Sequence, residues 1–308
     1  MKKQLRLWVY LPAVFVITAA AATLRTVAAF EDFNYQTGYF ADKTLISAAT
    51  FSLVFAILVA LTYPIFHRGI RLVASFEGGR TFIPSGTVSV ALLFIAFGFS
   101  QKLLSGNIPG SSIASGNATV TVIKVIMLFC IVFAVLSILG FFLTALSTRR
   151  EDKMRAWFEI GTVIFLVLYA VYLYFNSNLP INAPNKLVDM SAYLIASLFL
   201  LFETRISLGR AIWSAYITFG MIAFAATAYS AVPSLIVYLV KGELISDSVY
   251  EITLTLALCA FIAARIIGTA FLSEDTDAPI VSFIKRRDTE RLENKENELD
   301  GTGEDSSR

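Results

Sequence analysis

The residues of this sequence best able to do chemistry are ionisable side chains inside long apolar segments. Glu159 and Arg265 lie at similar distances from one end of their segments, and Lys124 and Glu251 lie nearer the opposite end of theirs. A charge in lipid is costly, so such groups are functional candidates by default. We expect Glu159 and Arg265 to be able to form an ion pair. The functional interpretation is a set of gates or a coupling-ion relay, and the structural alternative is snorkelling with packing salt bridges.

Neutral polar groups lie deeper in the apolar segments than the charged ones. The candidates for contact with a solute are Ser100, Tyr216, Thr227, Tyr229 and Ser230. Hydroxyl groups in lipid also bond between helices, which is the structural alternative for all five.

Signatures of enzymes and of bound cofactors are missing from the sequence. His67 is the single histidine, so a multi-histidine metal site is excluded. No zinc-protease, phosphate-binding, dinucleotide-binding or serine-hydrolase motif occurs. The sequence therefore predicts no catalytic residue, no metal and no cofactor, and an enzyme that acts on lipid has no positive support.

The elements that must position these groups are set by apolar segment length. Apolar residues make up 56% of the 308 positions and charged residues 16%, which is outside the range of ordinary soluble domains. About 20 apolar residues in a helix cross a hydrocarbon layer of ~30 Å. Eight segments meet this length: 7–29, 44–66, 87–104, 119–146, 155–175, 187–204, 211–240 and 249–272. Because backbone groups in lipid must bond internally, we predict an all-α, multi-pass integral membrane protein.

Lysine and arginine positions predict the orientation of these eight helices. With the N-terminus inside, twelve positive residues precede the tail on the cytoplasmic side and six lie on the opposite side. Both termini are then cytoplasmic, and we expect a plasma-membrane location. Residues 274–308 carry a net charge of −5, which leaves +7 on the rest of the chain. That excess suits loops at an anionic lipid bilayer and gives no support for nucleic-acid binding.

An internal match indicates two related halves. Residues 79–100 read GRTFIPSGTVSVALLFIAFGFS, and residues 209–230 read GRAIWSAYITFGMIAFAATAYS, at an offset of 130. Cys130 and Cys259 match at an offset of 129. We therefore predict a 4+4 parallel tandem repeat, and the alternative is the limited alphabet shared by all membrane helices. The predicted divisions are a first half at 1–147, a second half at 148–273 and a charged cytoplasmic tail, partly helical or disordered, at 274–308.

Two functions remain open from the sequence. The first is a small-solute transporter or permease with its site between the halves, lined by the third, fourth, seventh and eighth helices. Ser100 and Ser230 occupy equivalent repeat positions there. The second is a membrane-embedded sensor, scaffold or assembly subunit whose tail binds a cytoplasmic protein. A transporter needs a polar cavity near mid-membrane that exposes Ser100, Tyr229 or Ser230, whereas a scaffold allows a dry, packed core.

Overall fold

Eight long helices and one short hairpin make up the structure, which is a computed structural model. It describes residues 7–35, 37–66, 82–106, 117–146, 153–176, 180, 183–210, 212–245 and 248–272. Its elements are α1 (Leu7–Glu31), β1 (Phe33–Asn34), β2 (Tyr39–Phe40), α2 (Thr44–Phe66), α3 (Phe82–Ser105), α4 (Asn117–Leu146), α5 (Lys153–Phe175), α6 (Pro184–Ser207), α7 (Trp213–Lys241) and α8 (Val249–Leu272). Each of the eight helices in this described part is long and apolar enough to cross a membrane. The prediction of a multi-pass helical membrane protein is confirmed.

α3 and α6 begin three or more residues earlier than their apolar segments predicted. α3 begins at Phe82 instead of residue 87, and α6 begins at Pro184 instead of residue 187. Each has a proline in its first turn, Pro84 in α3 and Pro184 in α6. The first turn of a helix has no internal partner for its N–H groups, so proline is tolerated there. Pro84, Ser85 and Gly86 interrupt the apolar run near the start of α3, and Asn185 and Lys186 do so at the start of α6.

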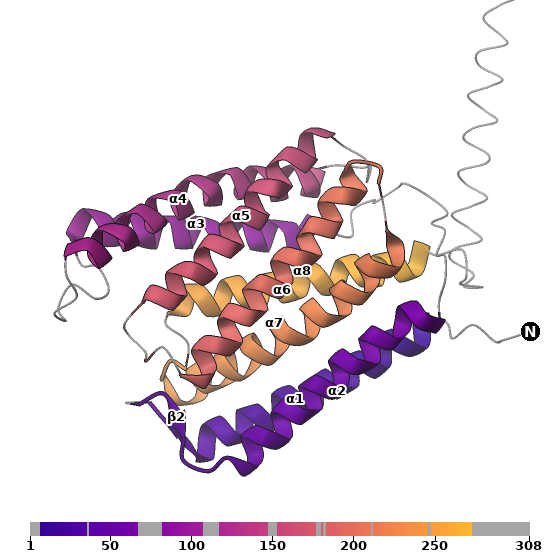
Figure 1. The fold of residues 1–308 in the computed structure, drawn as a ribbon, viewed down its shortest axis with the longest axis horizontal. Coiled ribbons are helices and arrows are strands. Elements are labelled where there is room, and N and C mark those ends of the chain that lie inside the picture. Colours follow the sequence, from indigo (N-terminus) through magenta and orange to yellow (C-terminus); the bar gives the residue numbers. More distant parts are fainter. Residues whose placement is uncertain are drawn as a thin grey trace, which may run out of the picture.

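The helices form a bundle in which α5–α8 lie between two helix pairs (Figure 1). α6 packs against α5, α7 and α8. The pair α3–α4 packs on one side, against α5 and α8, and the pair α1–α2 packs on the other side, chiefly against α7. The antiparallel strands β1 and β2 connect α1 to α2. We call the end of the bundle that contains this connection the hairpin end, and the opposite end, where α1 begins and α8 finishes, the terminal end (Figure 1).

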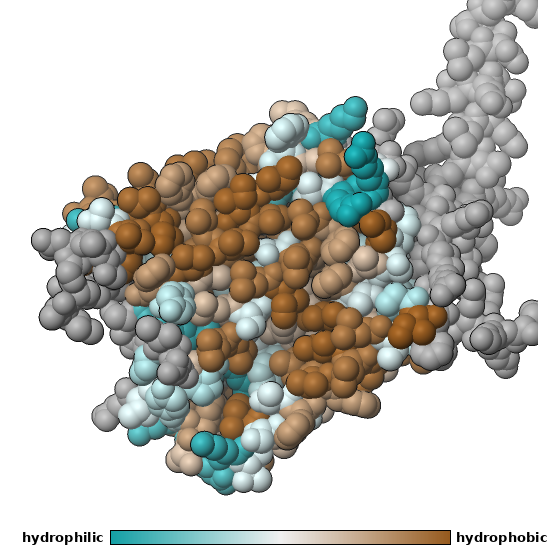
Figure 2. Space-filling model, viewed as in Figure 1, coloured by the Kyte–Doolittle hydropathy of each residue, from teal (hydrophilic) through white to brown (hydrophobic). Residues whose placement is uncertain are grey.

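The surface of the bundle is apolar along the length of the helices (Figure 2). Large side chains that would be buried in a soluble protein are exposed here, with Phe51 at 74% and Val16 and Ile65 at 69%. Teal, hydrophilic residues gather mainly toward the two ends of the bundle in this view (Figure 2). A lipid bilayer is the environment that this apolar band requires.

The helix neighbours do not follow the predicted repeat. α6 packs against α7, but the corresponding helices α2 and α3 lack an extensive contact. α1 packs against α7, whereas α5 and α3, which would correspond to them, do not pack extensively. The tandem repeat is therefore not confirmed by the packing, and it stays a prediction drawn from the sequence.

Glycines mark three places where helices approach closely. A Cβ added at Gly220 of α7 would lie 2.9 Å from Ile266 Cγ1 of α8 and 3.0 Å from Phe199 Cε2 of α6. Gly140 of α4 faces the backbone of α5, and Gly161 of α5 faces a side chain of α4. These glycines let α4 and α5, and α6, α7 and α8, pack at short range.

Candidate functional site

Five buried polar residues meet toward the terminal end of the bundle. Arg155 and Glu159 come from α5, and Glu203 and Ser207 come from α6; Arg265 comes from α8. Their exposed fractions range from 0% for Arg155 to 6% for Glu159. We call these five residues the terminal-end cluster.

Ion pairs and hydrogen bonds connect the members of the terminal-end cluster. Arg155 Nε lies 2.9 Å from Glu159 Oε1, and Arg155 Nη2 lies 3.7 Å from Glu203 Oε1. Ser207 Oγ accepts a hydrogen bond of 2.8 Å from Arg155 Nη2 and donates one of 2.8 Å to Glu159 Oε2. Arg265 Nη2 forms an ion pair with Glu203 Oε1. Three helices are thereby joined by one network.

Helical spacing explains why these groups can meet. Arg155 and Glu159 are four residues apart on α5, and Glu203 and Ser207 are four apart on α6, so each pair shares one helix face. Two positive and two negative side chains balance one another. An unbalanced charge at these buried positions would be strongly unfavourable, because little water reaches it.

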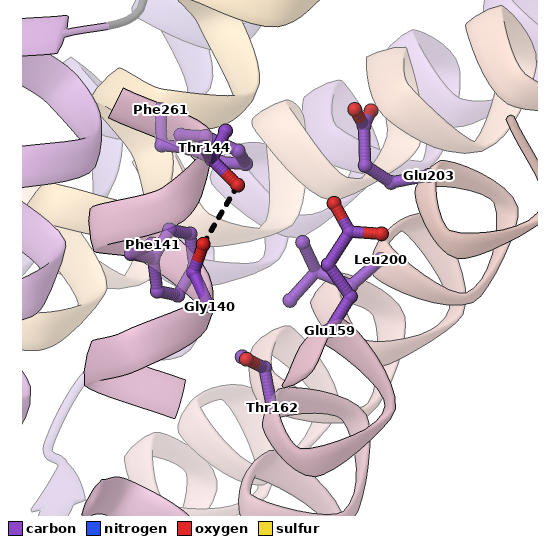
Figure 3. A pocket seen from close by; sticks show the side chains of 8 residues that line it. All are labelled: Gly140, Phe141, Thr144, Glu159, Thr162, Leu200, Glu203 and Phe261. Carbon is purple, nitrogen blue, oxygen red and sulfur yellow. Dashed lines mark hydrogen bonds between the residues drawn. The ribbon is translucent and has the colours of Figure 1, made fainter. Parts of the chain in front are cut away.

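A small cavity adjoins the terminal-end cluster (Figure 3). Its volume is ≈10 Å³, enough for about one water molecule. Its lining comes from four helices and consists of Gly140, Phe141, Thr144, Glu159, Thr162, Leu200, Glu203 and Phe261. Thr144 donates its hydroxyl to the Gly140 carbonyl, 2.9 Å away, in its own helix. Glu203 Oε2 is buried with no hydrogen-bond partner among the described residues, so the cavity has a free acceptor at its edge.

A second group of buried polar residues lies toward the hairpin end. Arg25 comes from α1, and Asn185 and Asp189 come from the first turns of α6; Tyr229 and Ser230 come from α7. All five are at most 3% exposed. We call them the hairpin-end cluster.

The guanidinium of Arg25 is the centre of the hairpin-end cluster. Arg25 Nη1 donates to the Tyr229 carbonyl at 2.6 Å, and Nη2 donates to Asn185 Oδ1 at 2.8 Å. Arg25 Cζ lies 4.6 Å from the centre of the Tyr229 ring. Ser230 Oγ donates a short hydrogen bond to Asp189 Oδ1, which holds that carboxylate against α7.

Further polar groups surround the hairpin-end cluster. Lys186 is buried and donates from Nζ to the Asn176 carbonyl at 2.5 Å. Glu251 is 2% exposed, and its backbone carbonyl accepts hydrogen bonds from Tyr193 and Thr255. This end of the bundle therefore buries both cations and anions in one region.

A packed apolar region separates the two clusters. Asp189 and Glu203 are fourteen residues apart on α6, which corresponds to about 21 Å along a helix. Between them the α6 side chains Tyr193, Ala196 and Phe199 are fully buried. Tyr193 packs edge-to-face on Tyr169 of α5, with ring centres 5.0 Å apart. No polar passage joins the clusters through these described residues.

The structure brings together some predicted site residues and separates others. Glu159 and Arg265 belong to one cluster, where the measured pairs join Glu159 to Arg155 and Arg265 to Glu203. Tyr229 and Ser230 belong to the other cluster.

The remaining predicted residues lie outside both clusters or beside them. Ser100 donates to the Ala96 carbonyl of its own helix, at 2.8 Å, and Lys124 is exposed on α4. Thr227 donates to the Ala223 carbonyl at 2.7 Å. Tyr216 is fully buried among aromatic rings, and Glu251 is buried near the hairpin-end cluster. The predicted equivalence of Ser100 and Ser230 does not extend to their hydrogen-bond partners.

Sequence reasoning missed α6 as the helix shared by both clusters. Asp189 and Glu203 stand near the two ends of the predicted sixth segment, 187–204. Their spacing contained the signal: one buried face of α6 carries residues three or four apart throughout its length, Lys186, Asp189, Tyr193, Ala196, Leu200, Glu203 and Ser207. A polar stripe at helical spacing faces protein, not lipid.

Comparison with known proteins assigns no family to the chain. No family model, no curated protein and no solved structure matches it. Among the described residues, no three His, Cys, Asp or Glu side chains gather closely enough to hold a metal ion. Function must therefore be argued from the two clusters.

Proposed function

We propose that this protein is a membrane transporter for a small polar solute and that its described conformation is an occluded one. The observation that carries the proposal is the pair of buried, multi-helix polar clusters at opposite ends of α5–α8. Ionisable groups are rare within membrane segments and usually mark ion or solute pathways. The two clusters lie about 21 Å apart along α6. This separation would allow them to act as gates on the two sides of a membrane.

Each cluster joins helices that would have to separate for a solute to pass. The terminal-end cluster joins α5, α6 and α8, and the hairpin-end cluster joins α1, α6 and α7. Opening one cluster while the other stays closed would give access from one side at a time. α6 belongs to both clusters, so a shift of α6 would affect the two gates together. The solute site then lies along α6, at one of the gates or between them, and not along the α3–α4 and α7–α8 pairs that the predicted repeat favoured.

A sensor or assembly subunit is the second candidate, because the centre of the bundle is packed. Tyr229 and Ser230 are buried and do not open on a cavity at mid-membrane, as a transporter open to one side would require. The charged tail that such a protein would use lies outside the described residues. Its net charge of −5 suits a basic partner on the same side of the membrane as the end of α8.

Locking the terminal-end cluster tests the transporter proposal. Glu159→Cys with Ser207→Cys places two thiols where Glu159 Oε2 and Ser207 Oγ are 2.8 Å apart. Cys130→Ala and Cys259→Ala remove the native thiols. The protein is reconstituted into liposomes, and currents or uptake are measured for a panel of amines, amino acids, sugars and organic acids. A short thiol crosslinker should abolish flux of whichever solute crosses, and reduction should restore it.

The control is the single variant Ser207→Cys, treated with the same reagent. It carries the modification without a link between α5 and α6, so its flux should persist. Absence of flux for every solute in the wild-type protein contradicts the transporter proposal. Capture of a basic membrane or cytoplasmic protein by residues 274–308, lost when those residues are removed, would then favour the second candidate.

A further inference from the structure

The hairpin-end cluster contains groups that can accept a cation, and all of these acceptors come from α6 and α7, not from α1. Pro233 has no N–H, so the Tyr229 carbonyl, four residues earlier in α7, lacks its helical donor. Asn185 Oδ1 lies on the first turn of α6. The Tyr229 ring offers its face, and Ser230 fixes the Asp189 carboxylate beside it. All these groups are at most 3% exposed.

This set of groups matches one chemical class of ligand. A backbone carbonyl and an amide oxygen accept hydrogen bonds, and an aromatic face attracts a cation. Asp189 lies within electrostatic range of the guanidinium and supplies a negative charge. An anion would be repelled by that charge, and a neutral ligand would not replace the positive charge of Arg25. Ammonium and guanidinium groups satisfy every member of the set.

Arg25 is the one part of the arrangement that comes from outside α6 and α7. α1 and α2 pack on the rest of the bundle chiefly through α7. A shift of this helix pair, or a rotamer change of the long Arg25 side chain, would withdraw the guanidinium and leave the acceptors in place. Replacing Arg25 by another cation keeps the charge of the cluster unchanged.

We propose that this α6–α7 face is a binding site for a small organic cation, an amine or guanidinium compound, and that Arg25 occupies it in the occluded conformation. The inference rests on the proposed function, since it names the class of solute. In this arrangement Arg25 acts as a tethered competitor. Solute entry and release of Arg25 are then a single exchange, which links occupation of the site to movement of α1.

Equilibrium binding of radiolabelled methylguanidinium to purified protein tests the site without any flux. The wild type should bind saturably, because Arg25 vacates the site for part of the time. Arg25→Ala removes the competitor and should bind at least about tenfold more tightly, since apparent affinity scales with the fraction of protein that is competent to bind. Adding Asp189→Asn to Arg25→Ala should weaken binding about tenfold or more. Arg205→Ala changes an exposed arginine on the same helix and should leave the affinity at the wild-type value.

A second variant covers failure of Arg25→Ala to fold. Arg25→Lys keeps a cation with fewer donors in its place, so its affinity for methylguanidinium should lie above that of the wild type. The site is overturned if neither the wild type nor Arg25→Lys binds methylguanidinium saturably. It is also overturned if Arg25→Ala binds methylguanidinium and the wild type does not, because the ligand then only fills the gap left by the deleted side chain. Saturable binding of acetate in competition with methylguanidinium overturns the cation assignment.

The outcomes for the site and for the transporter can be told apart. Methylguanidinium binding without flux of any solute supports the site and contradicts transport. Flux of an uncharged or anionic solute, with no cation binding, supports transport and overturns the site. Flux of methylguanidinium that Asp189→Asn abolishes supports both.

Discussion

Arg25 and Tyr229 are joined at the proline break of α7: the Arg25 guanidinium donates a 2.6 Å hydrogen bond to the Tyr229 carbonyl, which Pro233 leaves without its helical donor. A charge and a broken helix are each unfavourable in a membrane interior. Here the Arg25 guanidinium gains an acceptor, and the carbonyl at the helix break gains a donor. The two residues are 204 positions apart in the sequence, so this contact is a property of the fold and not of either segment.

We predict that Arg25 and Pro233 are energetically coupled. Arg25→Ala leaves the Tyr229 carbonyl and Asn185 without their donor and should lower the free energy of unfolding by about 3 kcal/mol. Pro233→Ala returns an N–H to that carbonyl, so Arg25→Ala should cost about 1 kcal/mol less in the Pro233→Ala background. Both native cysteines, Cys130 and Cys259, are buried and free, so reaction with a thiol-specific dye on heating measures unfolding. Equal costs in the two backgrounds would contradict the coupling.

The terminal-end cluster should be sensitive to single changes and tolerant of a paired change. Glu203→Ala leaves Arg265 without its ion-pair partner and should cost about 3–5 kcal/mol of unfolding free energy. Glu203→Leu combined with Arg265→Leu removes both charges and should cost clearly less than the two single changes added together. Glu31→Ala, at an exposed position at the end of α1, is the matched control and should stay within about 0.5 kcal/mol of wild type. If the unfolding free energies lost by the single changes at 203 and 265 add up to that lost by the paired change, the two charges do not stabilise one another.

Gly220 should tolerate no side chain. Its added Cβ would lie 2.9 Å from Ile266 Cγ1, between α7 and α8, so Gly220→Ala should destabilise the bundle by about 1–3 kcal/mol through overpacking. Gly86→Ala in α3 is the control, because no atom lies within 4 Å of its added Cβ. It should be neutral or stabilising by up to about 1 kcal/mol, since alanine is the better helix former. Thermal unfolding of both variants in one detergent gives the comparison.

The predicted orientation can be tested at the two ends of the bundle. Thr37→Cys lies in the hairpin and Arg210→Cys lies between α6 and α7, both at exposed positions. In a background without native cysteines, a membrane-impermeant maleimide applied to intact cells should label Thr37→Cys only. Arg210→Cys should react after permeabilisation, because the positive loops predict that the terminal end is cytoplasmic. The reverse labelling pattern would invert the topology and the two gates with it.

The helices were predictable because the requirement that forms them is local. A run of apolar residues such as 44–66 must satisfy its own backbone in lipid, and only a helix does so within one segment. Predicted and observed bounds agree at residues 44 and 66 for α2 and at 249 and 272 for α8. The predicted and observed starts differ most at α3 and α6, where a proline in the first turn and polar or glycine residues beside it interrupt the apolar run.

The partners of the buried charges were decided by the tertiary structure alone. Lipid and the protein interior are similarly apolar, so hydropathy indicates at most that a polar stripe such as that of α6 faces protein, and it cannot show which helix is the neighbour. Glu159 and Arg265 were recognised as candidates from sequence, but Arg155, Glu203 and Ser207, which connect them, come into reach only through the packing of α5, α6 and α8. The sequence determined how many times the chain can cross a membrane, because backbone hydrogen bonding in lipid is a local demand. The fold decided which charges meet, because neutralising a buried charge requires residues that are distant along the chain.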